Sequence, residues 1–292
     1  MKVIMTIIFA MTMFSLVTAQ PAGKVVCDVS MPSNILNWNV NYCIYLPPDY
    51  DQSMRNYPVV YLLHGYGDKE WGWVQFGEVN VAADRAIAAR EIPPMIIVMP
   101  EARLTFYVND YRGRQRYEDM FIREFIPYID KRYRTRADKE FRGVSGLSMG
   151  GYGALMFSMR YPNTFSACAA FSAAVWRHED LVGEEASREY NRGLKDLFGP
   201  LENGQLPKHF RLHNPLDLAK GMPADTLKKV RYYIDCGDDD FLIQGNMALH
   251  EAMLTRKIPH EFRVRDGSHS WPYWRSGIVD GLKFIGKSFH RF

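Results

Sequence analysis

The chain alternates between short strand-like segments, most of them apolar, and segments with helical spacing. The strand-like segments are seven to nine residues long, and most end at Gly or Pro; they comprise residues 57–65, 94–100, 140–146, 166–174, 230–237 and 260–267. Helical spacing is found at residues 79–90, 117–133 (with a possible kink at Pro127), 149–160, 245–257 and 273–289. Strands that alternate with helices predict an α/β fold with a mostly parallel central sheet.

Two segments interrupt this alternation. Residues 24–46 read as two strands joined by a turn, and Pro47-Pro48 ends the second strand. Residues 176–223 are polar and contain three turn signals, Gly199-Pro200, Asn203-Gly204 and Asn214-Pro215. We therefore expect an N-terminal hairpin and, near residues 176–223, an insertion with short helices of the kind that often shapes the pocket of an α/β enzyme.

The sequence GLSMG, residues 146–150, lies between a predicted strand and a predicted helix. It fits the pattern G-x-S-x-G, in which the chain turns sharply and the serine adopts a strained conformation. Larger side chains at positions 146 and 150 would clash with this turn. The serine oxygen would lie at a helix N-terminus, where the dipole favours negative charge. Ser148 is thus a candidate nucleophile, and the alternative is an ordinary serine in a glycine-rich turn.

A serine nucleophile needs a general base and a carboxylate that orients the base. In α/β-hydrolases the acid and then the histidine follow the serine along the chain. The loop after residues 230–237 supplies three candidate acids, Asp238, Asp239 and Asp240, at the carboxyl edge of the predicted sheet. Asp235 falls within the strand, so we expect it to be buried or structural.

Among the eight histidines, only His269 lies in a loop after the last predicted strand. Such a loop can place the imidazole over Ser148, so His269 is the candidate base. His64, at the end of a strand, is expected to be structural. The remaining histidines lie in the insertion, in a helix, at the start of a strand or in the tail: His178, His209, His213, His250, His260 and His290.

The tetrahedral oxyanion of acyl transfer needs two backbone N–H donors. One is expected from Met149, the residue after the nucleophile. The other is expected from the loop Gly65-Tyr66-Gly67, which follows the strand at residues 57–65, with Tyr66 as the better-placed donor.

The chain resembles the esterase D family of α/β-hydrolases. The resemblance is carried by YLLHGYGD, PMIIVMP, RYEDMFIREFIPYID, GLSMGGYGAL, IDCGDDDFL and GSHSWPYWR, and it extends from about residue 40 to residue 290. It implies the α/β-hydrolase fold, with helices on both faces of the sheet, in one domain over residues 20–292. In this family the acid is the third residue after the glycine of a Cys-Gly pair, which corresponds to Asp240, and Tyr66 matches the first oxyanion donor.

The family includes feruloyl and acetyl-xylan esterases, S-formylglutathione hydrolases and mycolyltransferases. The resemblance therefore implies a serine ester hydrolase, and we expect feruloyl or acetyl esters on a plant polysaccharide such as xylan to be its substrates. The alternatives are a general short-chain esterase, a thioesterase like S-formylglutathione hydrolase, a peptidase or dienelactone-type hydrolase, and a non-catalytic carbohydrate-binding protein on the same scaffold. Neither a metal nor an organic cofactor is implied.

Several aromatic residues fall in loops at the expected rim of the site. Trp71, Tyr107, Trp176 and Trp271 are the candidate substrate contacts, and Trp73 and Phe76 lie in the same loops. Their rings could stack on a sugar or a cinnamoyl group. The alternative is that they pack in the core or at its edge.

The N-terminus has the pattern of a secretory signal peptide. Lys2 precedes an apolar segment that ends in Val17-Thr18-Ala19, so cleavage is expected after Ala19 and the mature protein is expected in the periplasm or outside the cell, without a stable membrane anchor. An alternative is a buried helix or a membrane anchor. The chain carries a net charge of +3 with the two signs interspersed, which gives no indication of nucleic-acid binding.

Export would permit disulfide formation among the four cysteines. Cys27 and Cys43 could face each other across the hairpin, or could remain small buried hydrophobic residues. Cys168 and Cys236 lie in apolar strand segments, where we expect free buried thiols. No Cys/His spacing indicates a zinc site.

Overall fold

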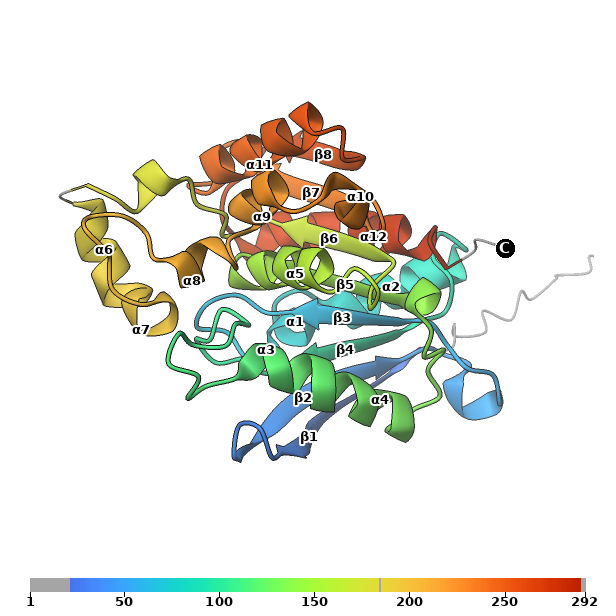
Figure 1. The fold of residues 1–292 in the computed structure, drawn as a ribbon. Helices are drawn as coiled ribbons and strands as arrows, with labels where there is room; N and C mark the ends of the chain where they lie inside the picture. Colours follow the sequence, from blue (N-terminus) through green and yellow to red (C-terminus); the bar gives the residue numbers. More distant parts are fainter. Residues whose placement is uncertain (1–21, 184, 290–292) are drawn as a thin grey trace, which may run out of the picture.

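The computed structural model describes residues 22–183 and 185–289, and the predicted signal peptide lies outside them. In these residues eight strands form one sheet in the order β1-β2-β4-β3-β5-β6-β7-β8 (Figure 1). The strands are β1 (Lys24–Ser33), β2 (Trp38–Leu46), β3 (Val59–Leu63), β4 (Ile96–Pro100), β5 (Arg142–Leu147), β6 (Ala167–Phe171), β7 (Arg231–Gly237) and β8 (His260–Arg265). The pairs from β4 to β8 are parallel, and β2 is antiparallel to both β1 and β4.

Helices cover both faces of the sheet. The helices are α1 (Gly72–Gln75), α2 (Val79–Ala88), α3 (Tyr117–Met120), α4 (Ile126–Arg132), α5 (Met149–Arg160), α6 (Ala186–Gly193), α7 (Lys195–Phe198), α8 (Lys208–Arg211), α9 (Pro215–Gly221), α10 (Ala224–Leu227), α11 (Ile243–Thr255) and α12 (Trp271–Gly286). Short 3₁₀ turns occur at Tyr50–Gln52, Lys139–Phe141 and His178–Asp180. The predicted α/β fold, with helices on both faces, is confirmed.

Two apolar cores lie on opposite faces of the sheet. One core packs α3, α4, α5, α9 and α11 against one face, and the other packs α2 and α12 against the opposite face. The central strands β3, β4 and β6 are buried along their whole length, which explains their continuous apolar sequence. The carboxyl ends of the parallel strands therefore meet at one edge of the sheet, where a site can form.

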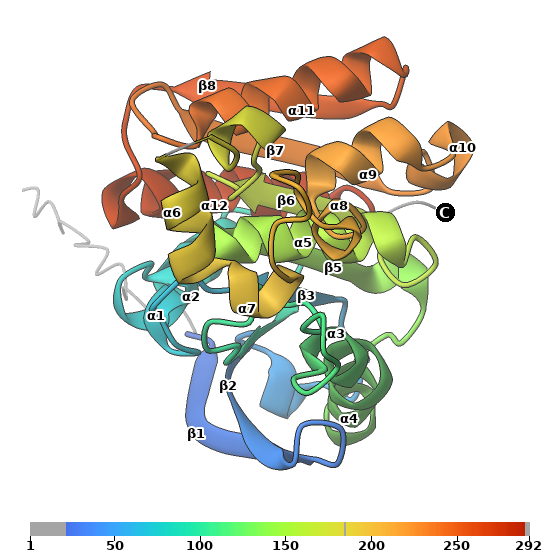
Figure 2. The ribbon, with the colours of Figure 1, turned by 60° about the vertical axis from the view of Figure 1, so that its left-hand side comes forward.

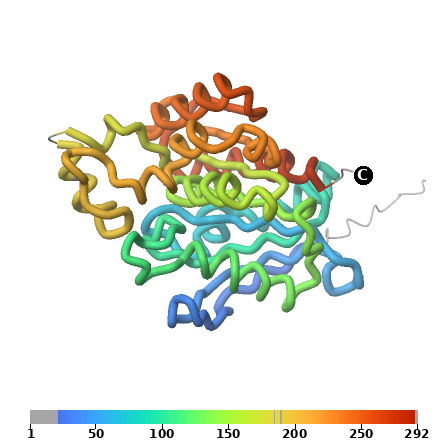
Figure 3. The backbone as a smooth tube through the Cα atoms, viewed as in Figure 1, coloured from blue at the N-terminus to red at the C-terminus, as the bar shows by residue number. Residues whose placement is uncertain are grey.

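The predicted insertion near residues 176–223 is present and contains a 3₁₀ turn and α6 to α9. Figure 1 shows α6 and α7 projecting beyond the body formed by the sheet and its helices, and the tube in Figure 3 shows the same excursion; in Figure 2 the two helices lie toward the viewer, in front of the sheet. The last helix of the insertion, α9, returns to pack on α5 and α11. The insertion thus lies against the strand ends that carry the candidate site.

The helix predicted at residues 117–133 is interrupted. A π-helical turn, Phe121–Phe125, separates α3 from α4. Pro127 has no N–H group to donate to the preceding turn, and its ring crowds the carbonyl four residues earlier, which favours a local change in helical pitch. The predicted irregularity is real, but it lies just before Pro127.

The N-terminal hairpin is closed by a disulfide. Cys27 in β1 bonds to Cys43 in β2, with their Cα atoms 4.2 Å apart, whereas Cys168 and Cys236 are buried free thiols. The register of β1 on β2 shifts between Val26 and Val29, so Cys27 lies in a bulge. Within residues 22–183 and 185–289, none of the helices has the length and apolar character needed to cross a membrane.

Replacing both bonded cysteines by alanine should lower the free energy of unfolding. The bridge closes a loop with a sequence separation of 16 residues, and a loop of this size corresponds to a loss of about 2–4 kcal/mol. Urea denaturation of the oxidised protein and of the Cys27→Ala/Cys43→Ala variant would measure this difference. A reductant should destabilise the parent and leave the variant unchanged; equal stabilities of parent and variant would contradict the prediction.

Candidate active site

The strand β5 and the helix α5 meet in a sharp turn at Ser148. This residue has φ of 52° and ψ of −117°, a conformation that non-glycine residues rarely adopt. A Cβ atom at Gly146 would lie 2.5 Å from the backbone of Gly150, and one at Gly150 would collide with the carbonyl oxygen of Leu63. The two glycines therefore let α5 approach β3 closely and place Ser148 at the carboxyl edge of the sheet.

Ser148, His269 and Asp240 form a continuous chain of hydrogen bonds. His269 Nε2 lies 2.9 Å from Ser148 Oγ, and His269 Nδ1 lies 2.9 Å from Asp240 Oδ2. Since the carboxylate can only accept, Nδ1 carries the proton and Nε2 is free to accept the proton of the serine hydroxyl. The structure thus brings together the three residues predicted as nucleophile, base and acid.

The neighbouring carboxylates lie outside this chain of hydrogen bonds. Asp238 and Asp239 are exposed, and Asp238 Oδ1 accepts hydrogen bonds from the N–H groups of Asp239 and Gly267. With Asp266 they form a group of carboxylates within 4.8 Å of one another. Exposed acidic groups of this kind are common without a metal ion, and nothing else among the described residues indicates one here.

The environment of Asp240 keeps its carboxyl group ionised. Burial raises the pKa of Asp240, but hydrogen bonds from His269, from Ser172 and from the Leu242 N–H together outweigh this effect. The pKa is therefore below its ordinary value. Ser172 is fully buried, and its hydroxyl accepts a hydrogen bond of 3.0 Å from the indole of Trp274. The Trp274 ring also packs edge-on against His269, at 4.9 Å. Ser172 and Trp274, which the sequence did not single out, therefore hold both the acid and the base.

A second buried carboxylate fixes the loop that carries His269. Asp235 is fully buried and accepts two hydrogen bonds from Arg265, of 2.9 and 3.0 Å, as well as one each from Tyr233 and Tyr273. These partners come from β7, β8 and α12. The loop that carries His269 is therefore anchored at both of its ends, by Arg265 before it and by Tyr273 after it. The expectation that Asp235 is structural is confirmed.

The loop expected to supply an oxyanion donor is held by His64. This buried side chain accepts a hydrogen bond from the Ala102 N–H at Nε2, so its proton is on Nδ1, which donates to the Gly65 carbonyl at 2.8 Å. Burial lowers the pKa of His64 to about 4, and the imidazole is neutral at neutral pH. A Cβ atom at Gly65 would lie 3.7 Å from Ser148 Cβ, so this loop passes beside the nucleophile. The donor roles of Tyr66 and Met149 remain predictions.

The prediction that Tyr107 lies at the rim is wrong. Tyr107 is fully buried, and its hydroxyl donates a hydrogen bond of 2.9 Å to the His64 carbonyl, which helps to hold the same loop. Its loop folds back into the core because Tyr107 packs on Tyr117 and Phe157. The sequence could not distinguish this packing from a rim position.

The other candidate aromatic contacts are partly buried. Trp71 packs on Phe76, Trp271 packs on Trp73 and Trp274, and Trp176 packs on Phe106. Trp73 itself is fully buried and donates a hydrogen bond to the Leu63 carbonyl. The most exposed aromatic residues near the triad are instead Tyr66 and Phe241, with 54% and 75% of their surfaces exposed.

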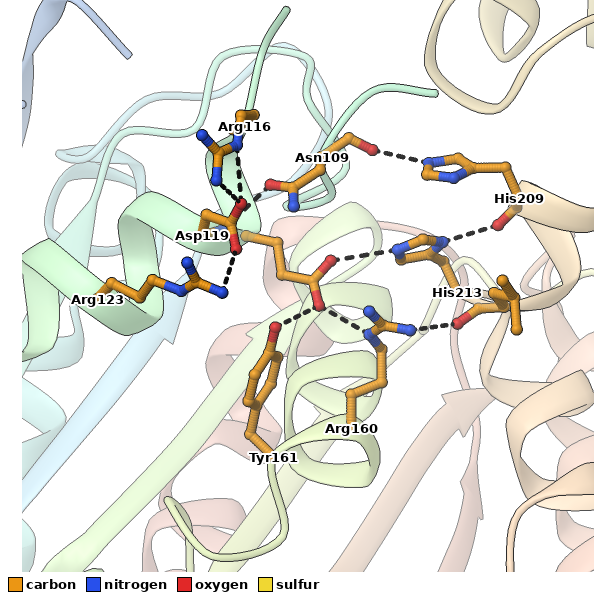
Figure 4. A network of polar contacts seen from close by, with 10 residues as sticks. Asn109, Arg116, Asp119, Arg123, Arg160, Tyr161, His209 and His213 are labelled. Carbon is orange, nitrogen blue, oxygen red and sulfur yellow. Dashed lines mark hydrogen bonds and ion pairs between the residues drawn. The ribbon is translucent and has the colours of Figure 1, made fainter. Parts of the chain in front are cut away.

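A polar network anchors the insertion to the helices beneath it (Figure 4). The buried carboxylate of Glu118, in α3, accepts hydrogen bonds of 2.7 Å from Arg160 and Tyr161 and lies 3.2 Å from His213 Nε2. His209, also in the insertion, bonds to the Asn109 carbonyl. Burial raises the pKa of Glu118, but the bonds to His213, Arg160 and Tyr161 outweigh it and bring the pKa to about 2.

Comparisons with known proteins agree with this geometry. The sequence profile of the Esterase family matches residues 33–285. A ferulic acid esterase of known structure is 33% identical, with a TM-score of 0.79, and the match covers 92% of this chain and 99% of that one. An acetyl esterase from Caldicellulosiruptor saccharolyticus is 26% identical over 277 residues, which are 90% of this chain and 98% of that protein.

A further relative is larger than this chain. It is an endo-1,4-beta-xylanase/feruloyl esterase from Xylanibacter ruminicola, 32% identical over 168 residues. The match covers 54% of this chain but only 23% of that protein. The similarity is therefore confined to about half of this chain and to a minor part of that protein.

Replacing Asp240 by asparagine should lower kcat for p-nitrophenyl acetate by about 10²–10⁴-fold. The amide would favour the wrong tautomer of His269 and would no longer stabilise its charged form. Asp239→Asn is the matched control, because Asp239 is exposed and the ring nitrogens of His269 bond to Asp240 and Ser148 instead; the activity of this variant should change less than about threefold. Steady-state kinetics of the two purified variants would test this, and equal losses would contradict the assignment of the acid.

The Glu118 network should make stability depend on pH in the acid range. Because the pKa of Glu118 is about 2 in the folded protein and 4.5 in the unfolded chain, its contribution is complete above pH 4.5 and is lost as the pH falls towards 2. The contribution is about 3 kcal/mol at 1.36 kcal/mol per pKa unit. Urea denaturation between pH 7 and pH 2 should show a steeper fall for the parent than for Glu118→Gln, which should already be less stable at pH 7.

Asp119→Asn is the control for that experiment. Asp119 is the neighbouring carboxylate, and its partners Arg116 and Arg123 are largely exposed, so its removal should cost less than about 1 kcal/mol. If Glu118→Gln and the parent lost stability in parallel as the pH fell, the role given to Glu118 would be wrong.

Proposed function

Because this chain belongs to the Esterase family of serine hydrolases, we propose that it hydrolyses ester-linked acyl groups on plant polysaccharide through an acyl-enzyme on Ser148. The observation that carries the proposal is the hydrogen-bonded chain from Ser148 through His269 to Asp240, located at a strained strand-to-helix turn. This arrangement supplies an activated nucleophile, its base and an orienting acid.

Acylation begins when His269 Nε2 removes the proton of Ser148 and Oγ attacks the ester carbonyl. The carbonyl oxygen becomes an oxyanion, and the N–H groups of Tyr66 and Met149 stabilise it. Met149 is the first residue of α5, where N–H groups have no partner within the helix. The bond to the alcohol oxygen then breaks as His269 donates its proton to that oxygen.

Deacylation repeats these steps with water. His269 removes a proton from a water molecule, the hydroxide attacks the acyl carbonyl, and Ser148 leaves with the proton that His269 returns. Asp240 holds Nδ1–H throughout and stabilises the imidazolium. No further co-reactant is needed.

Support for a polysaccharide substrate comes from relatives and from the predicted export. The ferulic acid esterase and the xylanase/feruloyl esterase favour a feruloyl group, and the acetyl esterase favours acetate. The signal-peptide pattern at residues 1–19 would bring the enzyme to the periplasm or the exterior, and so out of the cytoplasm, which a polysaccharide does not enter. A general short-chain esterase is the second candidate, because a 26% identical relative is an acetyl esterase.

Hydrolysis of p-nitrophenyl acetate and methyl ferulate by the protein from residue 20 onward would test the proposal. The parent should turn over at least one ester, and Ser148→Ala should lower kcat by at least about three orders of magnitude. Turnover of methyl ferulate would assign a feruloyl esterase, and turnover of the acetate alone would assign a deacetylase. A folded protein without turnover of either ester would favour the non-catalytic alternative.

A further inference from the structure

Phe241 is an exposed aromatic residue beside the candidate base. It follows Asp240 directly, and 75% of its surface is exposed. A phenylalanine side chain stabilises a fold by removing its apolar surface from water, so the fold gains little from this exposed residue. Its ring centroid lies 4.6 Å from that of His269. The ring is therefore available to something that approaches His269.

The position of Phe241 indicates which half of an ester substrate, acyl or alcohol, its ring would contact. His269 has Trp274 packed edge-on against it at 4.9 Å, within the fold, while Phe241 is on its exposed side. The leaving oxygen must come within hydrogen-bond distance of His269 Nε2 to be protonated. The alcohol half of the ester must therefore approach His269, and Phe241 is an exposed ring in contact with that residue.

A separate aromatic surface adjoins the oxyanion loop. Tyr66 packs on Phe106 at 5.8 Å, and Phe106 packs on Trp176 at 5.4 Å and on Tyr152 of α5 at 5.7 Å. Among the described residues, the ring contacts of this surface do not involve Phe241, whose ring contact is with His269. Tyr66 and Phe241 are therefore joined to the site through different neighbours.

The charges near Phe241 restrict what the alcohol half can be. The exposed carboxylates Asp238, Asp239 and Asp266 lie within 4.8 Å of one another in the adjoining loops. Their charges disfavour an anionic leaving group such as glutathione, in which two carboxylates and one ammonium group leave a net negative charge. Their oxygens can accept hydrogen bonds from hydroxyl groups, which suits a neutral sugar.

We propose that Phe241 is the platform on which the sugar ring bearing the ester stacks, on the alcohol side of the bond. This inference rests on the proposed function and deepens it. One face of a pyranose or furanose ring presents C–H groups, which pack on the electron-rich face of an aromatic ring. A long alkyl alcohol would instead need a continuous apolar groove.

The test compares two esters that share an acyl group. We would measure kcat/KM for a feruloylated arabinoxylan oligosaccharide and divide it by kcat/KM for methyl ferulate. If the enzyme accepts only acetate, an acetylated xylo-oligosaccharide and ethyl acetate replace these two esters. Any disturbance of His269 lowers both values and cancels in the ratio. Phe241→Ala should lower the ratio about tenfold, and Phe241→Trp should retain it.

Leu254→Ala is the control for the loss of an exposed apolar side chain. Leu254 lies near the end of α11 and is 62% exposed, and its removal should leave the ratio unchanged. If Phe241→Ala lowered kcat/KM equally for both esters, or changed neither, the ratio would be unchanged and the platform would be overturned. An equal loss would leave Phe241 as a support for His269.

A binding measurement separates this inference from the proposed function. Calorimetry of the feruloylated oligosaccharide with Ser148→Ala and with Ser148→Ala/Phe241→Ala needs no turnover. Binding that weakens about tenfold in the double variant supports the platform even if the parent has no esterase activity. Binding of equal strength in both variants, or no binding to either, overturns it.

Discussion

The structure depends on the close approach of α5 to β3, which only the glycines at positions 146 and 150 permit. This approach forces Ser148 into a conformation that costs about 1–3 kcal/mol. Hydrogen bonds with neighbouring segments compensate for the strain: the Ser148 N–H donates to the Phe171 carbonyl, and the Ser148 carbonyl accepts from Ala174. The nucleophile is therefore held by β6 as well as by its own turn, and the loop at Gly65, which is predicted to supply an oxyanion donor, passes beside it.

Two buried carboxylates outside the triad hold the parts of the site that are far apart in sequence. Asp235 joins β7, β8 and α12 around the loop of His269, and Glu118 joins α3, the end of α5 and the insertion. Both pair with an arginine and at least one tyrosine. Such groups are costly to bury unless every oxygen has a partner, and here they define the positions of loops that regular secondary structure does not fix.

The sequence predicted the sheet, most helices and the three triad residues because each depends on local pattern or on order along the chain. Ser148 is marked by its glycines, and His269 by its place after the last strand. Asp240 needed the family resemblance, since three adjacent aspartates are equivalent locally. Tyr107 was misplaced, and Ser172 and Glu118 were missed, because their roles come from tertiary contacts. The sequence could not decide whether Cys27 and Cys43 form a disulfide, because their spacing along the chain does not reveal that their Cα atoms lie 4.2 Å apart.

The disulfide and the bulge in β1 also affect the free edge of the sheet. β1 is an edge strand, and an edge strand presents unpaired backbone groups to which another chain can add. The bulge between Val26 and Val29 breaks the regular spacing of those groups, and the bond to Cys43 prevents β1 from detaching. The oxidised hairpin thus keeps β1 over the edge of β2, so that the backbone groups of β2 that pair with β1 stay covered.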